Sequence, residues 1–256
     1  MEKKTVLRFT ALTFIIALVT WAICAVFGVL GLSVENAPWL YIFVALCAFS
    51  PTIASYIILK KNNEVEGFKE WLKNVFAFKT SFRFYLLVIL LIIVYYAPKC
   101  IVIGLNEAQP FYMFFALIPA TLIFGGIEEA GWSYVLRPKL DKKFGFIISS
   151  LIVAVIWAVW HIPVLLPQGR IESLSWFGLF AISLIGESFA LGAIIRITKN
   201  VFLCVLFHTV SNAVSGTLFG SSDSLFGNIL SSGLLIAASI IAVSIYEKKG
   251  QSFFSD

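Results

Sequence analysis

Long apolar runs constrain the fold of this chain more than any other feature of its sequence. Eight runs are long enough for an α-helix to cross the hydrocarbon core of a bilayer, which takes about 20 residues. Hydrophobic residues make up 60% of the 256 residues and charged residues 13%, which excludes an ordinary soluble domain. Lipid satisfies no backbone polar groups, so continuous runs indicate helices, whereas barrel strands would alternate. We therefore predict an all-α polytopic membrane protein, with spans near 9–30, 39–59, 84–103, 111–136, 144–166, 176–195, 201–219 and 226–246.

The basic residues between these runs predict the orientation of the chain. One set of connections carries little positive charge beyond Lys99 and Arg170, and it also holds Glu35, Glu107, Glu172 and Asp223. The other set carries Lys3, Lys4, Arg8, Lys60, Lys61, Lys69, Lys73, Lys79, Arg83, Arg137, Lys139, Lys142, Lys143, Arg196, Lys199, Lys248 and Lys249. The positive-inside rule places the basic set in the cytoplasm, and in an eight-span chain both termini then lie there too. The first run is longer than the core of a signal peptide, so we expect a retained anchor in the cell membrane.

One basic connection has the pattern of an amphipathic helix. Phe68, Trp71, Leu72, Val75 and Phe76 recur at helical spacing, with lysines between them. Such a segment fits the membrane interface, its lysines facing anionic lipid headgroups, although an ordinary cytoplasmic helix has the same pattern. Membrane lipids are therefore a predicted partner.

The remaining composition excludes several other classes of protein. The basic residues form no continuous stripe, so nucleic acid is not an expected partner. Cys24, Cys47, Cys100 and Cys204 stand singly in or beside apolar runs, which indicates buried thiols and no disulfide framework. No repeat or linker divides the chain, and we predict a single transmembrane domain over residues 1–256.

Five polar side chains inside the apolar runs are the candidates for chemistry. Glu128 and Glu129 are adjacent in the stretch FGGIEEAGWSYVLRPKL, and His161 and His208 are the only histidines in the chain. Asn212 lies four residues after His208 and therefore on the same helix face. Ionisable groups are costly in a bilayer, so they indicate a functional site. Glu187, in the sixth run, either joins this site or pairs with Arg196.

These residue types suit hydrolysis. A glutamate can deprotonate a water directly, or a Glu and His set can do so through a divalent metal such as zinc, for which Glu128, His161 and His208 would be the ligands. An asparagine amide can stabilise the developing oxyanion.

The expected depths of these residues in the membrane disagree. Glu128 and His208 would lie about 12–13 Å from the cytoplasmic ends of their helices and His161 about 26 Å. We expect the fifth span either to tilt or to begin along the interface.

Three short motifs resemble a known family. EEAGW (128–132), WAVWH (157–161) and HTVSN (208–212), in this order on successive helices, are similar to the motifs of the CPBP family. This family comprises Rce1-like CAAX proteases and bacteriocin-processing or Abi proteins. The resemblance covers about 112–219, the expected catalytic core. It implies an intramembrane glutamate endopeptidase. In such an enzyme Glu128 and His161 would activate the water, and Glu129 would support Glu128. His208 and Asn212 would bind the water or stabilise the oxyanion. The implied partner is a peptide or protein substrate, which in this family can be lipidated.

The first motif departs from the family pattern. That pattern is EExxxR, but Ser133 stands four residues after Glu129, and Arg137 comes one turn later. Arg137 could reach back toward Glu129, or it could only mark the membrane boundary. A catalytically inactive protein of the same fold, acting in bacteriocin immunity or as a membrane scaffold, is therefore the alternative function. A transporter fits less well, because the polar residues cluster in one half of the chain.

Overall fold

The structure is a computed structural model that describes residues 2–165, 174–219 and 224–248. All elements in these ranges are helices and none is a strand, so the predicted all-α fold is confirmed. Arg170, Glu172, Asp223 and Lys249 lie outside the described residues. The helices are α1 (Glu2–Val29), η1 (Pro38–Leu40), α2 (Tyr41–Ala48), α3 (Ser50–Lys61), α4 (Phe68–Val75), α5 (Phe82–Ile103), α6 (Tyr112–Ile123), η2 (Gly126–Glu128), α7 (Glu129–Gly131), η3 (Trp132–Leu136), α8 (Arg137–Leu165), α9 (Leu174–Thr198), α10 (Val201–Leu218) and α11 (Leu225–Lys248).

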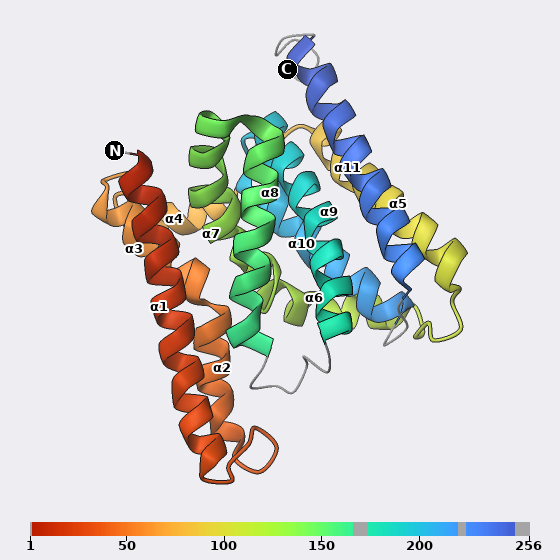
Figure 1. Ribbon diagram of the computed structural model, residues 1–256. Coiled ribbons are helices and arrows are strands. Elements are labelled where there is room, and N and C mark those ends of the chain that lie inside the picture. Colours follow the sequence, from red (N-terminus) through yellow and green to blue (C-terminus); the bar gives the residue numbers. More distant parts are fainter. Residues whose placement is uncertain (1, 166–173, 220–223, 249–256) are drawn as a thin grey trace.

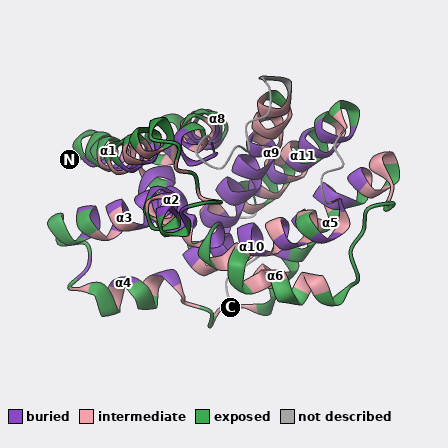
Figure 2. Ribbon diagram, turned by 90° about the horizontal axis from the view of Figure 1, so that it is seen from below, coloured by how far each residue is buried: buried purple, intermediate pink, exposed green. Residues whose placement is uncertain are grey.

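Helices α9 and α10 form the centre of the bundle. Figure 2 shows them largely buried, whereas α1 and α6 carry long exposed stretches. Helix α10 packs against α5, α6 and α9 and also against η2 and α7. The exposed side chains of α1 are mainly apolar, as lipid contact requires, and include Leu7, Ile15, Leu18, Val19 and Val26. The central helices are therefore the ones that can carry costly polar groups away from lipid.

The predicted second span is bent. Helices α2 and α3 meet at an angle of 47° around Phe49, and Pro51 stands in the first turn of α3, where a missing N–H is tolerated. By length and composition, the described helices provide six candidate spans, or seven if this bent pair counts as one. The protein is thus polytopic, as predicted.

One of these candidates turns back on itself. The stretch 112–165 has 54 residues, and a straight helix of this length would extend about 80 Å, far beyond a bilayer core of about 30 Å. Gly145, at φ 74° and ψ 171°, breaks α8, and Figure 1 shows the green chain reversing there. If this stretch crosses twice, the chain has the eight crossings that the sequence predicts. The start of α1 and the end of α11 also lie at the same end of the bundle in Figure 1.

The connection expected at 137–143 is not a loop, and this prediction was wrong. Helix α8 starts at Arg137 and continues through these residues, whose charges have partners elsewhere in the chain. Asp141 pairs with Arg196, which also bonds Glu247 of α11. Lys139 bonds Glu64 and Lys142 bonds Glu2. The turn lies instead at Gly145, where a positive φ suits glycine.

Helix α4 confirms the predicted amphipathic segment. Trp71 and Val75 are buried, and the Trp71 indole N–H donates to Ser55 Oγ at 3.0 Å. Asn74 bonds the Tyr134 hydroxyl at 2.9 Å. Phe68 remains exposed. One edge of the helix is thus fixed to the bundle, and its position in the membrane interface stays a prediction.

Lys99 was expected in a loop, but it lies within α5 and is 8% exposed. Its ammonium lies 4.5 Å from the centre of the Tyr95 ring and 3.2 Å from the Tyr95 hydroxyl. Aromatic faces attract a desolvated cation, which allows this lysine to be buried.

Candidate active site

The two acids lie where a membrane helix is interrupted. Helix α6 ends at Ile123, Gly125 is non-helical, and a short 3-10 turn, one α-turn and a π-helix follow before α8. Pro138 lacks the N–H that would donate to the Tyr134 carbonyl, which favours the widened turn before it. The interruption places the acids at the centre of the bundle, against α10.

Gly125 and Gly126 allow α10 to approach this segment. A Cβ atom on Gly125 would lie 2.5 Å from Asn212 Nδ2 and 2.9 Å from the Thr121 carbonyl oxygen. One on Gly126 would clash with the Thr209 hydroxyl and lie 2.8 Å from the Val205 carbonyl oxygen. Only glycine at both positions brings the chain this close to α10.

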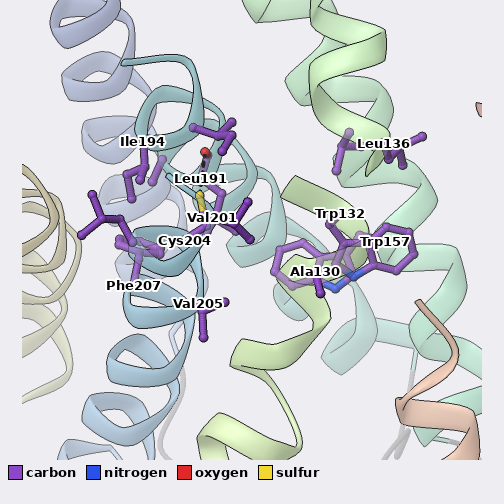
Figure 3. Packing of buried hydrophobic residues seen from close by; sticks show 14 of the residues in the cluster. Ala130, Trp132, Leu136, Trp157, Leu191, Ile194, Val201, Cys204, Val205 and Phe207 are labelled. Carbon is purple, nitrogen blue, oxygen red and sulfur yellow. Dashed lines mark hydrogen bonds between the residues drawn. The ribbon is translucent and has the colours of Figure 1, made fainter. Parts of the chain in front are cut away.

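Glu128 is held by two tryptophans. Its Oε2 atom accepts the indole N–H of Trp157 at 2.9 Å and that of Trp132 at 3.2 Å. Figure 3 shows the two rings together beside Ala130. The carboxyl group is 4% exposed, and two donors to a single oxygen fix its orientation. The sequence did not predict this role, for which the i, i+4 spacing of Glu128 and Trp132 was the available signal.

Glu129 has a separate set of partners. Its Oε1 atom lies 3.1 Å from His208 Nδ1, and its Oε2 atom accepts a hydrogen bond from the Ser133 hydroxyl. The side chain is fully buried. Ser133, which replaces the arginine of the family pattern, therefore satisfies Glu129 directly.

His208 and Asn212 address the same small volume. Because His208 Nδ1 faces Glu129, its Nε2 atom lies on the opposite side of the ring. A Cβ atom added to Gly125 would lie 3.3 Å from His208 Nε2 and 2.5 Å from Asn212 Nδ2, so both nitrogen atoms face the same position. The structure thus brings together Glu129, His208 and Asn212 around Gly125, as the shared face on α10 predicts.

His161 lies on the other side of Trp157. Its Nδ1 atom is 2.8 Å from the Trp157 carbonyl oxygen, which can only accept, so Nδ1 carries the proton and Nε2 is the basic nitrogen. The Trp157 ring centre lies 5.6 Å from that of His161 and 5.2 Å from that of His208. The Trp160 and Phe180 rings also pack against the imidazole, and the centre of each ring lies 4.8 Å from the centre of the imidazole. Trp157 therefore contacts His161, His208 and Glu128.

The turn at Gly145 explains the predicted mismatch in depth. The estimate for Glu128 measured depth from Arg137, but the helix continues past Arg137 to the turn. Glu128 lies 17 residues before Gly145, and His161 lies 16 residues after it. The two legs therefore carry Glu128 and His161 at similar distances along the chain from one turn, whereas His208 lies eight residues after Asn200, the N-cap of α10.

A metal site does not fit these side chains. Within residues 2–165, 174–219 and 224–248, no three His, Cys, Asp or Glu side chains are placed to hold an ion. Glu128, His161 and His208, the ligands considered from sequence, are not such a group in these ranges.

For two neighbouring charges, the structure decides against one of the two alternatives that the sequence left open. Arg137 does not bond Glu129, since it is 1% exposed and its guanidinium donates to the Ser188 carbonyl at 2.8 Å and the Ser188 hydroxyl at 3.2 Å. Glu187 does not pair with Arg196. Its Oε1 atom accepts the Ser211 hydroxyl at 2.9 Å, on α10.

Comparison with known proteins supports the resemblance. A family model described as type II CAAX prenyl endopeptidase Rce1-like matches residues 110–214. This segment is Rce1-like. The match confirms the resemblance to the CPBP and CAAX-protease family. No curated protein matches the chain. The Rce1-like segment contains all five predicted site residues, Glu128, Glu129, His161, His208 and Asn212, and it runs from just before α6 through most of α10.

Proposed function

We propose that this protein is an intramembrane endopeptidase that hydrolyses a peptide bond with a water activated by Glu128. The observation that carries the proposal is that the two adjacent acids have different hydrogen-bond partners. Glu128 has an oriented carboxylate among indoles, while Glu129 holds His208 with Nε2 beside the Asn212 amide. A base and a pair of oxyanion donors are the two requirements of direct hydrolysis.

In the proposed reaction, Glu128 takes a proton from water, and the water oxygen bonds to the carbonyl carbon of the peptide. The carbonyl oxygen becomes an oxyanion, which accepts hydrogen bonds from the Asn212 amide and from Nε2–H of protonated His208. His208 keeps its Nδ1 proton and donates it to Glu129, whose carboxylate balances the imidazolium charge. The C–N bond then breaks, and the proton held by Glu128 passes to the leaving nitrogen.

His161 has the supporting role of orienting the water. Its Nδ1–H is committed to the Trp157 carbonyl, so Nε2 is the acceptor for a water proton. Trp157 holds Glu128 with its indole and His161 with its backbone. One residue therefore fixes both groups that act on water.

The proposed substrate is a peptide or protein segment at the membrane, with lipidated CAAX-type peptides as the first class to test because of the family description. Purified protein in lipid nanodiscs would be incubated with paired peptides ending in a CAAX sequence, one farnesylated and one not. Products would be identified by mass spectrometry. We expect cleavage of at least one peptide, with loss of at least 100-fold in rate for Glu128→Gln.

The matched control is Glu35→Gln, which removes an exposed acid in the connection between α1 and η1. This variant should cleave like wild type. Equal rates for Glu128→Gln and Glu35→Gln would refute the proposed role of Glu128.

A further inference from the structure

A third buried acid takes no part in the proposed reaction. Glu187 lies in the middle of α9 and is 8% exposed. Its Oε1 atom accepts the hydroxyl of Ser211, and Ser211 is also contacted by Tyr96 of α5, whose hydroxyl donates to the Ser211 carbonyl at 2.7 Å. Burying a carboxyl group in a bundle is costly, so its retention needs a reason.

Both contacts meet α10 at the residue next to Asn212. Side chains advance by about 100° per residue around an α-helix. Relative to His208, Asn212 therefore points about 40° to one side, Thr209 about 100° to the same side, and Ser211 about 60° to the other. His208 and Asn212 lie between Thr209 and Ser211 on the helix surface.

These two flanking residues are held by different parts of the fold. Thr209 packs on Gly126, where any Cβ atom would collide with its hydroxyl. Ser211, about 160° away around the helix, is bonded by Glu187 and Tyr96. A rotation of α10 in either direction would lose one of these contacts.

We propose that Glu187 is a positioning residue that, together with Tyr96, fixes the rotation of α10 and so the placement of His208 Nε2 and the Asn212 amide. A rotation of about 20° moves an atom 5–6 Å from the helix axis by about 2 Å. Misplacement by about 1 Å can cost about 100-fold in rate. The Glu187 carboxyl acts as the hydrogen-bond acceptor for Ser211. Glutamine can therefore replace it, and leucine, of similar size, cannot.

The first test does not depend on catalytic activity. The chain has two histidines, so protein labelled with 15N-histidine gives two imidazole signal sets, which His161→Gln assigns. We expect Ser211→Ala and Glu187→Leu to shift the His208 signals and leave those of His161 in place. Glu187→Gln should retain the wild-type His208 signals. Should Glu187→Leu not fold, Ser211→Ala alone decides this test, because it removes only one hydroxyl.

The second test rests on the proposed function. With a cleaved peptide, Ser211→Ala should lower kcat at least tenfold with little change in KM, and Glu187→Gln should retain kcat within about threefold. If wild type cleaves no peptide, the proposed function fails, and the histidine signals still test the role of Glu187.

Ser239→Ala is the matched control, since Ser239 is a buried serine on α11 whose hydroxyl bonds the Leu235 carbonyl of its own helix. It should change neither the His208 signals nor kcat. If Ser211→Ala keeps the wild-type His208 signals, the proposed role of Glu187 is wrong. It is also wrong if Glu187→Gln loses both kcat and the wild-type His208 signals.

Discussion

Glu128 and Glu129 are adjacent in the sequence but have separate environments. The indoles of Trp132 and Trp157 donate to Glu128, whereas Glu129 bonds Ser133 and His208. Charged groups hydrogen-bonded by separate partners keep separate orientations. These environments support the proposal that Glu128 activates water and that Glu129 supports His208.

Ser133 tests whether the departure from the family arginine damages this site. Ser133→Ala removes the hydroxyl donor to the buried Glu129 carboxylate. A lost hydrogen bond to a charged group costs about 1.5–3 kcal/mol, so we expect lower stability in detergent and a lower cleavage rate. Thermal unfolding and peptide cleavage would measure the two effects. Unchanged values of both would show that Glu129 does not depend on Ser133.

Asn212 is the proposed amide donor to the oxyanion. Asn212→Ala removes this donor and adds no bulk beside Gly125. We expect kcat to fall by about 100–1,000-fold with a smaller change in KM, as for other oxyanion donors. Steady-state kinetics on a cleaved peptide would check this. A rise in KM with normal kcat would assign Asn212 to substrate binding instead.

At the scale of elements, the close approach of η2 to α10 forms the site. Gly125→Ala would place a Cβ atom against Asn212 Nδ2 and the Thr121 backbone. Since backbone cannot move aside like a flexible side chain, we expect a loss of about 1–3 kcal/mol in stability, together with loss of cleavage. Gly28→Ala, in α1 with nothing within 4 Å of the new Cβ, is the control and should be neutral or slightly stabilising. A stable, active Gly125→Ala protein would contradict this packing.

Much of this arrangement could be predicted from sequence, because lipid imposes simple rules on composition. Apolar runs gave the helical class, and the cost of buried charge singled out Glu128, Glu129, His161 and His208. The turn at Gly145 was missed because the charges of residues 137–143 suggest a solvated loop. They are instead paired with distant groups such as Arg196 and Glu2. Tertiary partners of this kind leave no local pattern.

Other residues were misassigned for related reasons. Arg137 and Lys99 are buried by contacts with Ser188 and with tyrosine rings, which sequence spacing does not reveal. The role of Trp157 was not predicted, because the indole is mainly apolar. Its N–H is the closer of the two indole donors to Glu128.

For the whole molecule, the positive-inside rule predicts that both termini and the turn at Gly145 lie in the cytoplasm. The start of α1, the end of α11 and this turn share one end of the bundle (Figure 1). Reporter fusions at each terminus, and an epitope tag inserted after Lys143, should all report the cytoplasmic side. If the reporters placed the two termini on opposite sides of the membrane, the predicted orientation of the chain and the even number of membrane crossings would both be wrong.

We propose above that Glu128 activates the water that cleaves the substrate. The most direct measurement is a single-turnover cleavage in H2(18)O, with mass spectrometry of the new carboxyl terminus. We predict one 18O atom in that carboxyl group for wild type, and no labelled product for Glu128→Gln on the same timescale. Labelled product formed by Glu128→Gln at the wild-type rate would show that Glu128 is not the base that activates this water.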